Sequence, residues 1–221
     1  MEPLELDVFF DYHCPYSERA IRWLELLGPE RIRPRYLFFP LEQVNRDAAA
    51  SEWRLWEQPL DYGHYRGRQD RRALPSFLVT ALLEADEMPE VVSRFRLAVL
   101  DARFREAADL SDLALLRRVA ADAGADAARL EAALADPVRV ATARKRIADD
   151  WREARSEYLI FGVPTLRPHE GAPFYLRLER GPGPEEAVGL FDRLIELRRA
   201  APFLVELKVP ERTIIPQAVT A

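Results

Sequence analysis

The stretch Phe10-Asp11-Tyr12-His13-Cys14-Pro15-Tyr16-Ser17 joins a predicted strand to a predicted helix, and the fold prediction starts from it. Residues 4–11 are rich in β-branched and aromatic side chains, which is typical of a strand buried on both faces. Pro15 suits the first position of a helix, where its missing N–H would have no partner. Apolar residues then recur at helical spacing, at Ala20, Trp23, Leu24 and Leu27. Cys14 is therefore expected at a helix N-terminus.

A second strand is predicted at residues 32–39, with Pro34 near its start or on an edge of the sheet. Because a helix separates the two strands, they form a βαβ unit and should run parallel with a right-handed crossover. From about residue 48 to 158 the pattern is nearly all helical, with Ser111 and Asp126 as candidate N-caps. The predicted helices cover residues 74–84, 89–105, 113–122, 127–134 and 137–158.

Strand patterns return at residues 162–166 and 172–178, which we expect to pair as a hairpin before a last helix. The order β-α-β, helical block, β-β-α predicts an α/β fold of thioredoxin-like type, a mixed four-stranded sheet flanked by helices with a large all-helical insertion. The expected domains are a core of residues 1–47 and 160–201, an insertion of residues 48–159 and a C-terminal arm of residues 202–221. A homodimer is left open, since the arm is apolar and could lie on this subunit or a partner.

Cys14 is the only cysteine, so the chain forms no internal disulfide and no Cys-based zinc cage. The three histidines are scattered, and no metal site is expected. A thiol at a helix N-terminus meets unpaired N–H groups, which favour the reactive thiolate. Ser17 can direct its N–H and hydroxyl at the sulfur, and protonated His13 would add positive charge. The alternative is that Cys14 fills space beneath the helix.

These residues carry a resemblance to a known family. The segment Phe10 to Ser17 resembles the active site of the DsbA-like thioredoxin-fold family, where a CPxC motif follows the first core strand. Residues 161–165, Phe-Gly-Val-Pro-Thr, resemble the family's second landmark, a loop with a cis-proline that faces the cysteine. Residues 35–45 and 104–111 resemble the FrnE-like branch more loosely. The likeness implies Cys14 and Ser17 as catalytic residues, and it implies substrate contacts from His13, Pro15, Tyr16, Val163, Pro164 and Thr165.

Ser17 stands where dithiol members of the family have a second cysteine. The resemblance therefore implies a monothiol thiol-disulfide oxidoreductase that works through mixed disulfides with a small thiol or a client protein. It implies no tightly bound cofactor, with glutathione or another low-molecular-weight thiol as co-substrate. The related chromene-carboxylate isomerases and kappa-class glutathione transferases use serine to hold the thiolate of glutathione, so a glutathione-dependent isomerase or transferase stays open. A non-catalytic binding module is the third reading.

The stretch from Trp53 to Arg72 mixes aromatic residues with arginines and fits either a ligand clamp or core aromatics beside a solvated basic turn. We favour the second interpretation. A formal net charge of −5 argues against a nucleic-acid partner. No apolar stretch is long enough to span a membrane, and the N-terminus lacks the pattern of a secretory signal, so we expect a cytoplasmic protein without a membrane partner.

Overall fold

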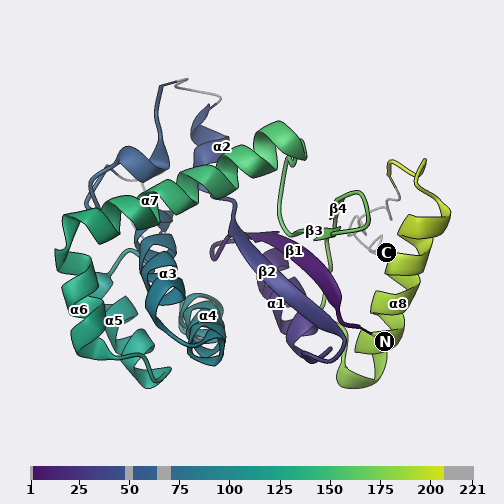
Figure 1. Cartoon of the computed structure of the whole chain (residues 1–221), viewed down its shortest axis with the longest axis horizontal. Helices are drawn as coiled ribbons and strands as arrows, with labels where there is room; N and C mark the ends of the chain where they lie inside the picture. The colour runs from purple at the N-terminus through teal and green to yellow at the C-terminus, as the bar shows by residue number, and fades with distance from the viewer. Residues whose placement is uncertain (1, 48–51, 64–70, 207–221) are drawn as a thin grey trace, which may run out of the picture.

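A computed structural model describes residues 2–47, 52–63 and 71–206 of the 221-residue chain (Figure 1). Its sheet has four strands in the order β2-β1-β3-β4. β1 (Leu4–Phe10) pairs parallel with β2 (Ile32–Phe38) and antiparallel with β3 (Thr165–Pro168), which pairs antiparallel with β4 (Phe174–Tyr175). The predicted mixed sheet, the parallel βαβ unit and the β3–β4 pairing are confirmed.

The strands after the helical block are shorter than predicted. The strand expected at residues 162–166 begins at Thr165, because the chain turns at a cis peptide bond between Val163 and Pro164. The strand expected at residues 172–178 is reduced to β4, two residues long, after Pro173, which has no N–H to donate. Pro34 lies within β2, an edge strand, where a missing N–H is tolerated.

The helical pattern of the sequence is largely confirmed, with two corrections. The helix expected to run from residue 137 to 158 leaves α-helical geometry after Arg152 and continues as a π-helical turn. Asp112 rather than Ser111 caps the fifth helix, since the Asp112 side chain accepts from the N–H of Ala114; Asp126 is an N-cap as predicted. The helices are α1 (Pro15–Glu25), α2 (Leu41–Asp47), the 3₁₀ helix η1 (Leu55–Glu57), α3 (Leu74–Asp86), α4 (Pro89–Phe104), α5 (Leu113–Asp122), α6 (Ala127–Ala135), α7 (Pro137–Arg152), the π-helix η3 (Glu153–Glu157) and α8 (Pro184–Ala200).

The two faces of the sheet carry different side chains. Leu6, Val8 and Phe10 of β1 point into the main core, which includes buried residues of α1, α3 and α8. Asp7 and Phe9 alternate with them and point to the other face. Asp7 is fully buried there, and it lies opposite Arg35 of β2 and Arg167 of β3 in register. Both arginines bind its carboxylate, with the distance from Arg35 Nε to Asp7 Oδ1 2.7 Å.

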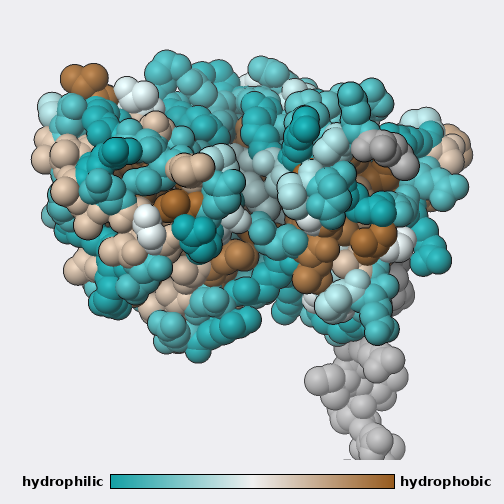
Figure 2. All heavy atoms as spheres, turned by 60° about the horizontal axis from the view of Figure 1, so that its bottom comes forward, coloured by the Kyte–Doolittle hydropathy of each residue, from teal (hydrophilic) through white to brown (hydrophobic). Residues whose placement is uncertain are grey.

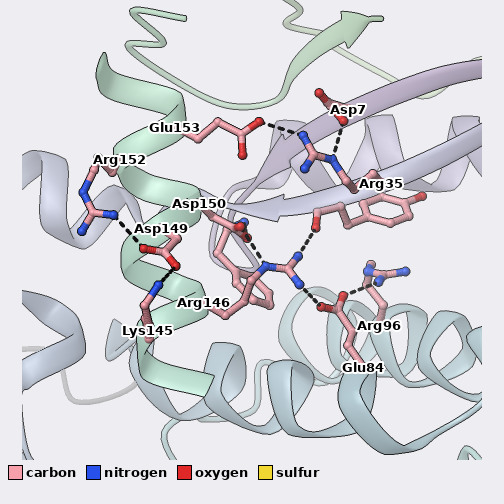
Figure 3. Close-up of polar contacts among 12 residues, drawn as sticks. Asp7, Arg35, Glu84, Arg96, Lys145, Arg146, Asp149, Asp150, Arg152 and Glu153 are labelled. Carbon is pink, nitrogen blue, oxygen red and sulfur yellow. Dashed lines mark hydrogen bonds and ion pairs between the residues drawn. The ribbon is translucent and has the colours of Figure 1, made fainter. Parts of the chain in front are cut away.

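Helix α7 connects the helical region with the sheet (Figure 1) and covers the outer edge of β2. Asp150 Oδ2 accepts the N–H of Phe38 at 3.0 Å, and Arg146 donates to the carbonyl of Tyr36 at 3.1 Å. Arg146 Nε also donates to Asp150 Oδ1 at 2.8 Å, and its guanidinium approaches Glu84 of α3 (Figure 3). Side chains thus satisfy strand groups that an exposed edge would leave open to another strand.

The surface shown in Figure 2 is mainly hydrophilic, and its hydrophobic residues form separate areas over the helical part and the sheet-containing part. In the described residues, no helix combines the length and the apolar character needed to span a bilayer. The proposed division at residues 47/48 and 159/160 stays a prediction.

The edge contact predicts a stability difference between two neighbouring aspartates of α7. We expect Asp150→Ala to lower the free energy of unfolding by about 2–3 kcal/mol, because it leaves the Phe38 N–H and Arg146 without their buried acceptor. Asp149→Ala is the matched control, since Asp149 pairs with Lys145 and Arg152 in solvent (Figure 3) and should cost at most about 0.5 kcal/mol. Urea unfolding followed by circular dichroism measures both. Equal losses in the two variants would contradict the role given to Asp150.

Candidate active site around Cys14

Cys14 is the N-cap residue of α1, immediately after the turn that follows β1. Its side chain is buried, with 4% of the residue exposed, and Sγ donates a hydrogen bond to the carbonyl oxygen of Val163 at 3.3 Å. Val163 precedes Pro164, and the peptide bond between them is cis. The fold therefore brings together the two segments that the sequence singled out, although they are far apart along the chain.

A small apolar cluster surrounds the sulfur. It lies on the Phe9 face of the sheet and is separate from the main core. The chain that leaves η3 contributes Ile160 to this cluster, and it is held by hydrogen bonds from the N–H of Ile160 to the carbonyl of Ala154 and from Arg155 to the carbonyl of Ile160. The buried members of the cluster are Phe9, Cys14, Leu37, Phe39, Ala154, Ile160 and Val163.

The environment of the sulfur contradicts one prediction from the sequence. Burial raises the pKa of the Cys14 thiol above its ordinary value, although the N–H and hydroxyl of Ser17 and the N–H of Tyr16 act in the opposite direction. The negative charge of Asp11 raises the pKa further. The expectation that the helix N-terminus would stabilise a thiolate is therefore wrong for this conformation, because desolvation outweighs the N–H groups. The structure holds a thiol that donates to Val163.

The two neighbours of the sulfur in the motif differ in what they contact. Ser17 is fully buried, and its hydroxyl accepts the N–H of Asp11 at 3.4 Å. His13 is directed to Asp11: the distance from its Nδ1 to Asp11 Oδ1 is 3.4 Å, and its N–H donates to the same oxygen at 2.7 Å. Sequence reasoning missed Asp11, which is 1% exposed and lies between the strand and Cys14. A charged residue directly after the apolar run Val8-Phe9-Phe10 and three positions before Cys14 is the signal that could have found it.

The loop around the cis bond is fixed by its own hydrogen bonds. Thr165 Oγ1 donates to the carbonyl of Gly162 at 2.7 Å, and the carbonyl of Pro164 accepts the N–H of Leu176 at 3.0 Å. The carbonyl of Val163 accepts the hydrogen bond from Cys14 Sγ. Substrate contacts from Val163, Pro164 and Thr165 stay a prediction.

Aromatic residues and arginines lie next to this loop. The guanidinium carbons of Arg177 and Arg19 lie 4.5 and 5.3 Å from the centre of the Tyr16 ring. Tyr175 stacks against Phe161 with ring centres 5.3 Å apart, and Phe161 is 68% exposed. Burial raises the pKa of Tyr175, and the Cys14 thiolate charge would raise it further, which places this ring near the sulfur. Pro15 begins α1 and is exposed.

The aromatic and basic stretch from Trp53 to Arg72 is mainly structural in the part that the structure describes. Tyr62 is buried and its hydroxyl donates to Glu42. Burial raises the pKa of Glu42. Trp56 packs near Trp151. Arg72 is buried rather than solvated, and it donates to the carbonyl of Tyr62 and to Ser111 Oγ. His64, Tyr65, Arg66 and Arg68 lie outside the described residues. Within residues 2–47, 52–63 and 71–206, no group of three or more metal-binding side chains comes together.

Comparison with solved structures gives the fold a family context. The cytosolic disulfide reductase DsbM from Pseudomonas aeruginosa superposes with a TM-score of 0.59 and 17% identity, over 88% of this chain and 100% of that one. A structure of DsbM with GSH superposes with a TM-score of 0.56. A probable DsbA oxidoreductase from Streptomyces coelicolor gives 0.57 and 18% identity over 95% and 94% of the chains. A 2-hydroxychromene-2-carboxylate isomerase gives 0.56 and 16% identity over 92% and 100%. The chain thus has the DsbA-like thioredoxin fold, as the sequence resemblance implied.

Sequence comparison reaches less far. No family model matches the chain. An uncharacterized protein from Mycobacterium tuberculosis is 29% identical over 162 residues, which are 73% of this chain. The match spans 63% of the length of that relative.

The buried thiol predicts an unusual pH dependence of alkylation. We expect native Cys14 to react slowly with iodoacetamide, and its rate should rise with pH at a higher midpoint than that of the urea-unfolded chain, because burial raises the pKa of the native thiol. The same shift should lower folding stability as the pH rises through the thiol range, since the folded state holds its proton longer. A native midpoint below the unfolded control would show a stabilised thiolate and contradict this assignment.

Proposed function

We propose that the chain catalyses thiol–disulfide exchange through a mixed disulfide at Cys14. The hydrogen bond from Cys14 Sγ to the Val163 carbonyl is the observation that carries the proposal. It places the sulfur beside a backbone segment that an extended thiol or peptide could pair with, in the manner of strand addition. The DsbA-like fold supports the same reaction class.

The proposed reaction has two displacements at sulfur. In the first, the Cys14 thiolate attacks one sulfur of a substrate disulfide, the substrate S–S bond breaks, and the other substrate sulfur leaves as a thiolate. In the second, a thiolate from solution attacks the bound sulfur, forms a new disulfide with it and releases Cys14, which takes up a proton. The net reaction exchanges one thiol partner of the disulfide and requires no further oxidant or reductant.

The state of Cys14 favours exchange with a pool of small thiols over the storage of oxidising power. A strong protein-thiol oxidant relies on a stabilised cysteine thiolate as leaving group. Burial has the opposite effect on Cys14, and Ser17 leaves the site without a resolving cysteine. Glutathione is the proposed co-substrate, and the DsbM structure with GSH supports this choice by analogy. The protein then acts without a tightly bound cofactor.

A glutathione-dependent isomerase or transferase is the second candidate. The observation that favours it is that Cys14 is held as a thiol that donates a hydrogen bond, and a serine hydroxyl can donate in the same way. The isomerase among the structural neighbours shares the fold. In this reaction Cys14 or Ser17 would hold the thiolate of bound glutathione, and no covalent bond to the protein would form.

Turnover by the isosteric variant Cys14→Ser separates the two functions. The assay follows glutathione oxidation in the presence of a glutathionylated peptide, with melting temperatures to confirm that the variant is folded. Exchange requires a nucleophilic sulfur, so we expect the variant to lose about 100-fold or more of the activity.

Full activity in Cys14→Ser would contradict exchange through Cys14. Glutathione binding and isomerase or conjugation activity that survive the substitution would establish the second candidate. If the wild-type chain has neither activity and does not bind glutathione, the fold serves as a binding module and the proposal fails.

A further inference from the structure

Asp11 is a buried carboxylate with partners on two sides of the active-site turn. On one side, Oδ1 accepts the N–H of His13 at 2.7 Å, in the turn that leads into Cys14. On the other side, Oδ2 accepts the N–H of Leu41 at 2.7 Å, at the start of α2. The backbone of Asp11 also contributes, because its carbonyl accepts the N–H of Cys14 at 3.1 Å. One residue therefore joins β1, the Cys14 turn and α2.

The charged and titratable groups that face Asp11 come from three segments. His13 lies beside it in the turn, Glu42 faces it from α2, and Cys14 faces it from the start of α1. Glu42 is itself buried, accepts the N–H of Ala73 at 3.1 Å, and pairs with Arg46. The Glu42 carboxylate thus has its own partners in Tyr62, Ala73 and Arg46.

Other titratable groups near Cys14 come from α1 and from β4. Tyr175 of β4 interacts electrostatically with Cys14, with Tyr16 of α1 and with Arg177, which also lies over the Tyr16 ring. These groups and Asp11 therefore act on the Cys14 sulfur from different parts of the fold. Asp11 is the anionic group nearest in the chain to Cys14, and a negative charge held close to a buried thiol disfavours its ionisation.

We propose that Asp11 is a positioning residue of the Cys14 site: its carboxylate joins the turn that carries Cys14 to the start of α2, and it holds a negative charge beside that turn. Both effects follow from one buried side chain, because its two oxygens are occupied by N–H donors and its charge has little solvent to screen it. The inference rests on the proposed function only in taking Cys14 as the reacting group.

Asp11→Asn tests the proposal with Asp7→Asn as the matched control. Asparagine preserves the size of the side chain and one oxygen acceptor but removes the charge. At pH 7.5 we expect Cys14 in Asp11→Asn to be alkylated roughly three- to tenfold faster than in the wild type, with the pH profile moved to lower pH. Asp7 lies within β1 and is buried like Asp11, but it is bound by Arg35, Arg167 and His169. Asp7→Asn should lower stability and leave the profile unchanged.

The outcomes are distinct. Equal profiles for wild type and Asp11→Asn, or the same shift in both variants, would overturn the proposal. A wild-type measurement serves if Asp11→Asn does not fold: the ¹³C shift of the Asp11 carboxyl should respond to the ionisation of Cys14 at alkaline pH, a response that is absent in Cys14→Ser. No such response in the wild type would overturn the proposal. If the chain shows no exchange activity but Asp11→Asn still moves the alkylation profile, the proposed function fails and the role of Asp11 stands.

Discussion

The hydrogen bond between Cys14 Sγ and the Val163 carbonyl joins two segments that are 149 residues apart in the chain. It depends on the sheet, because β1 ends at the Cys14 turn and β3 begins just after Val163, and these strands pair antiparallel. It depends equally on α7, whose side chains cover the edge of β2 and whose end leads through η3 to Ile160, a member of the Cys14 cluster. The site is thus assembled from both halves of the sheet and from the helical region.

Desolvation and hydrogen bonding compete at this sulfur. The helix N-terminus offers N–H groups that favour a thiolate, whereas the apolar cluster and Asp11 favour the thiol, and burial has the largest effect. Exchange chemistry then requires that a substrate reach a sulfur that is almost fully covered. The rings of Phe161 and Tyr175, which pack together next to the loop, are exposed.

Much of the fold could be predicted because its signals are local. Alternation in β1, the helical spacing after Pro15 and the order of elements were sufficient for the sheet, and the two motifs brought Cys14 and Val163 to one site. Three features could not be predicted in this way: the role of Asp11, the raised pKa of Cys14 and the burial of Arg72. Each depends on burial and on partners distant in sequence. The break in the helix after Arg152 has no proline or glycine to mark it.

Intact-mass spectrometry of the folded protein after incubation with glutathione disulfide tests whether Cys14 forms a mixed disulfide. We expect the wild-type chain to gain one glutathionyl group, peptide mapping to locate it at Cys14, and excess reduced glutathione to remove it. Cys14→Ser should gain none. A native chain that stays unmodified while the urea-unfolded chain becomes glutathionylated would show that Cys14 is an inaccessible structural residue, and it would contradict thiol–disulfide exchange at Cys14.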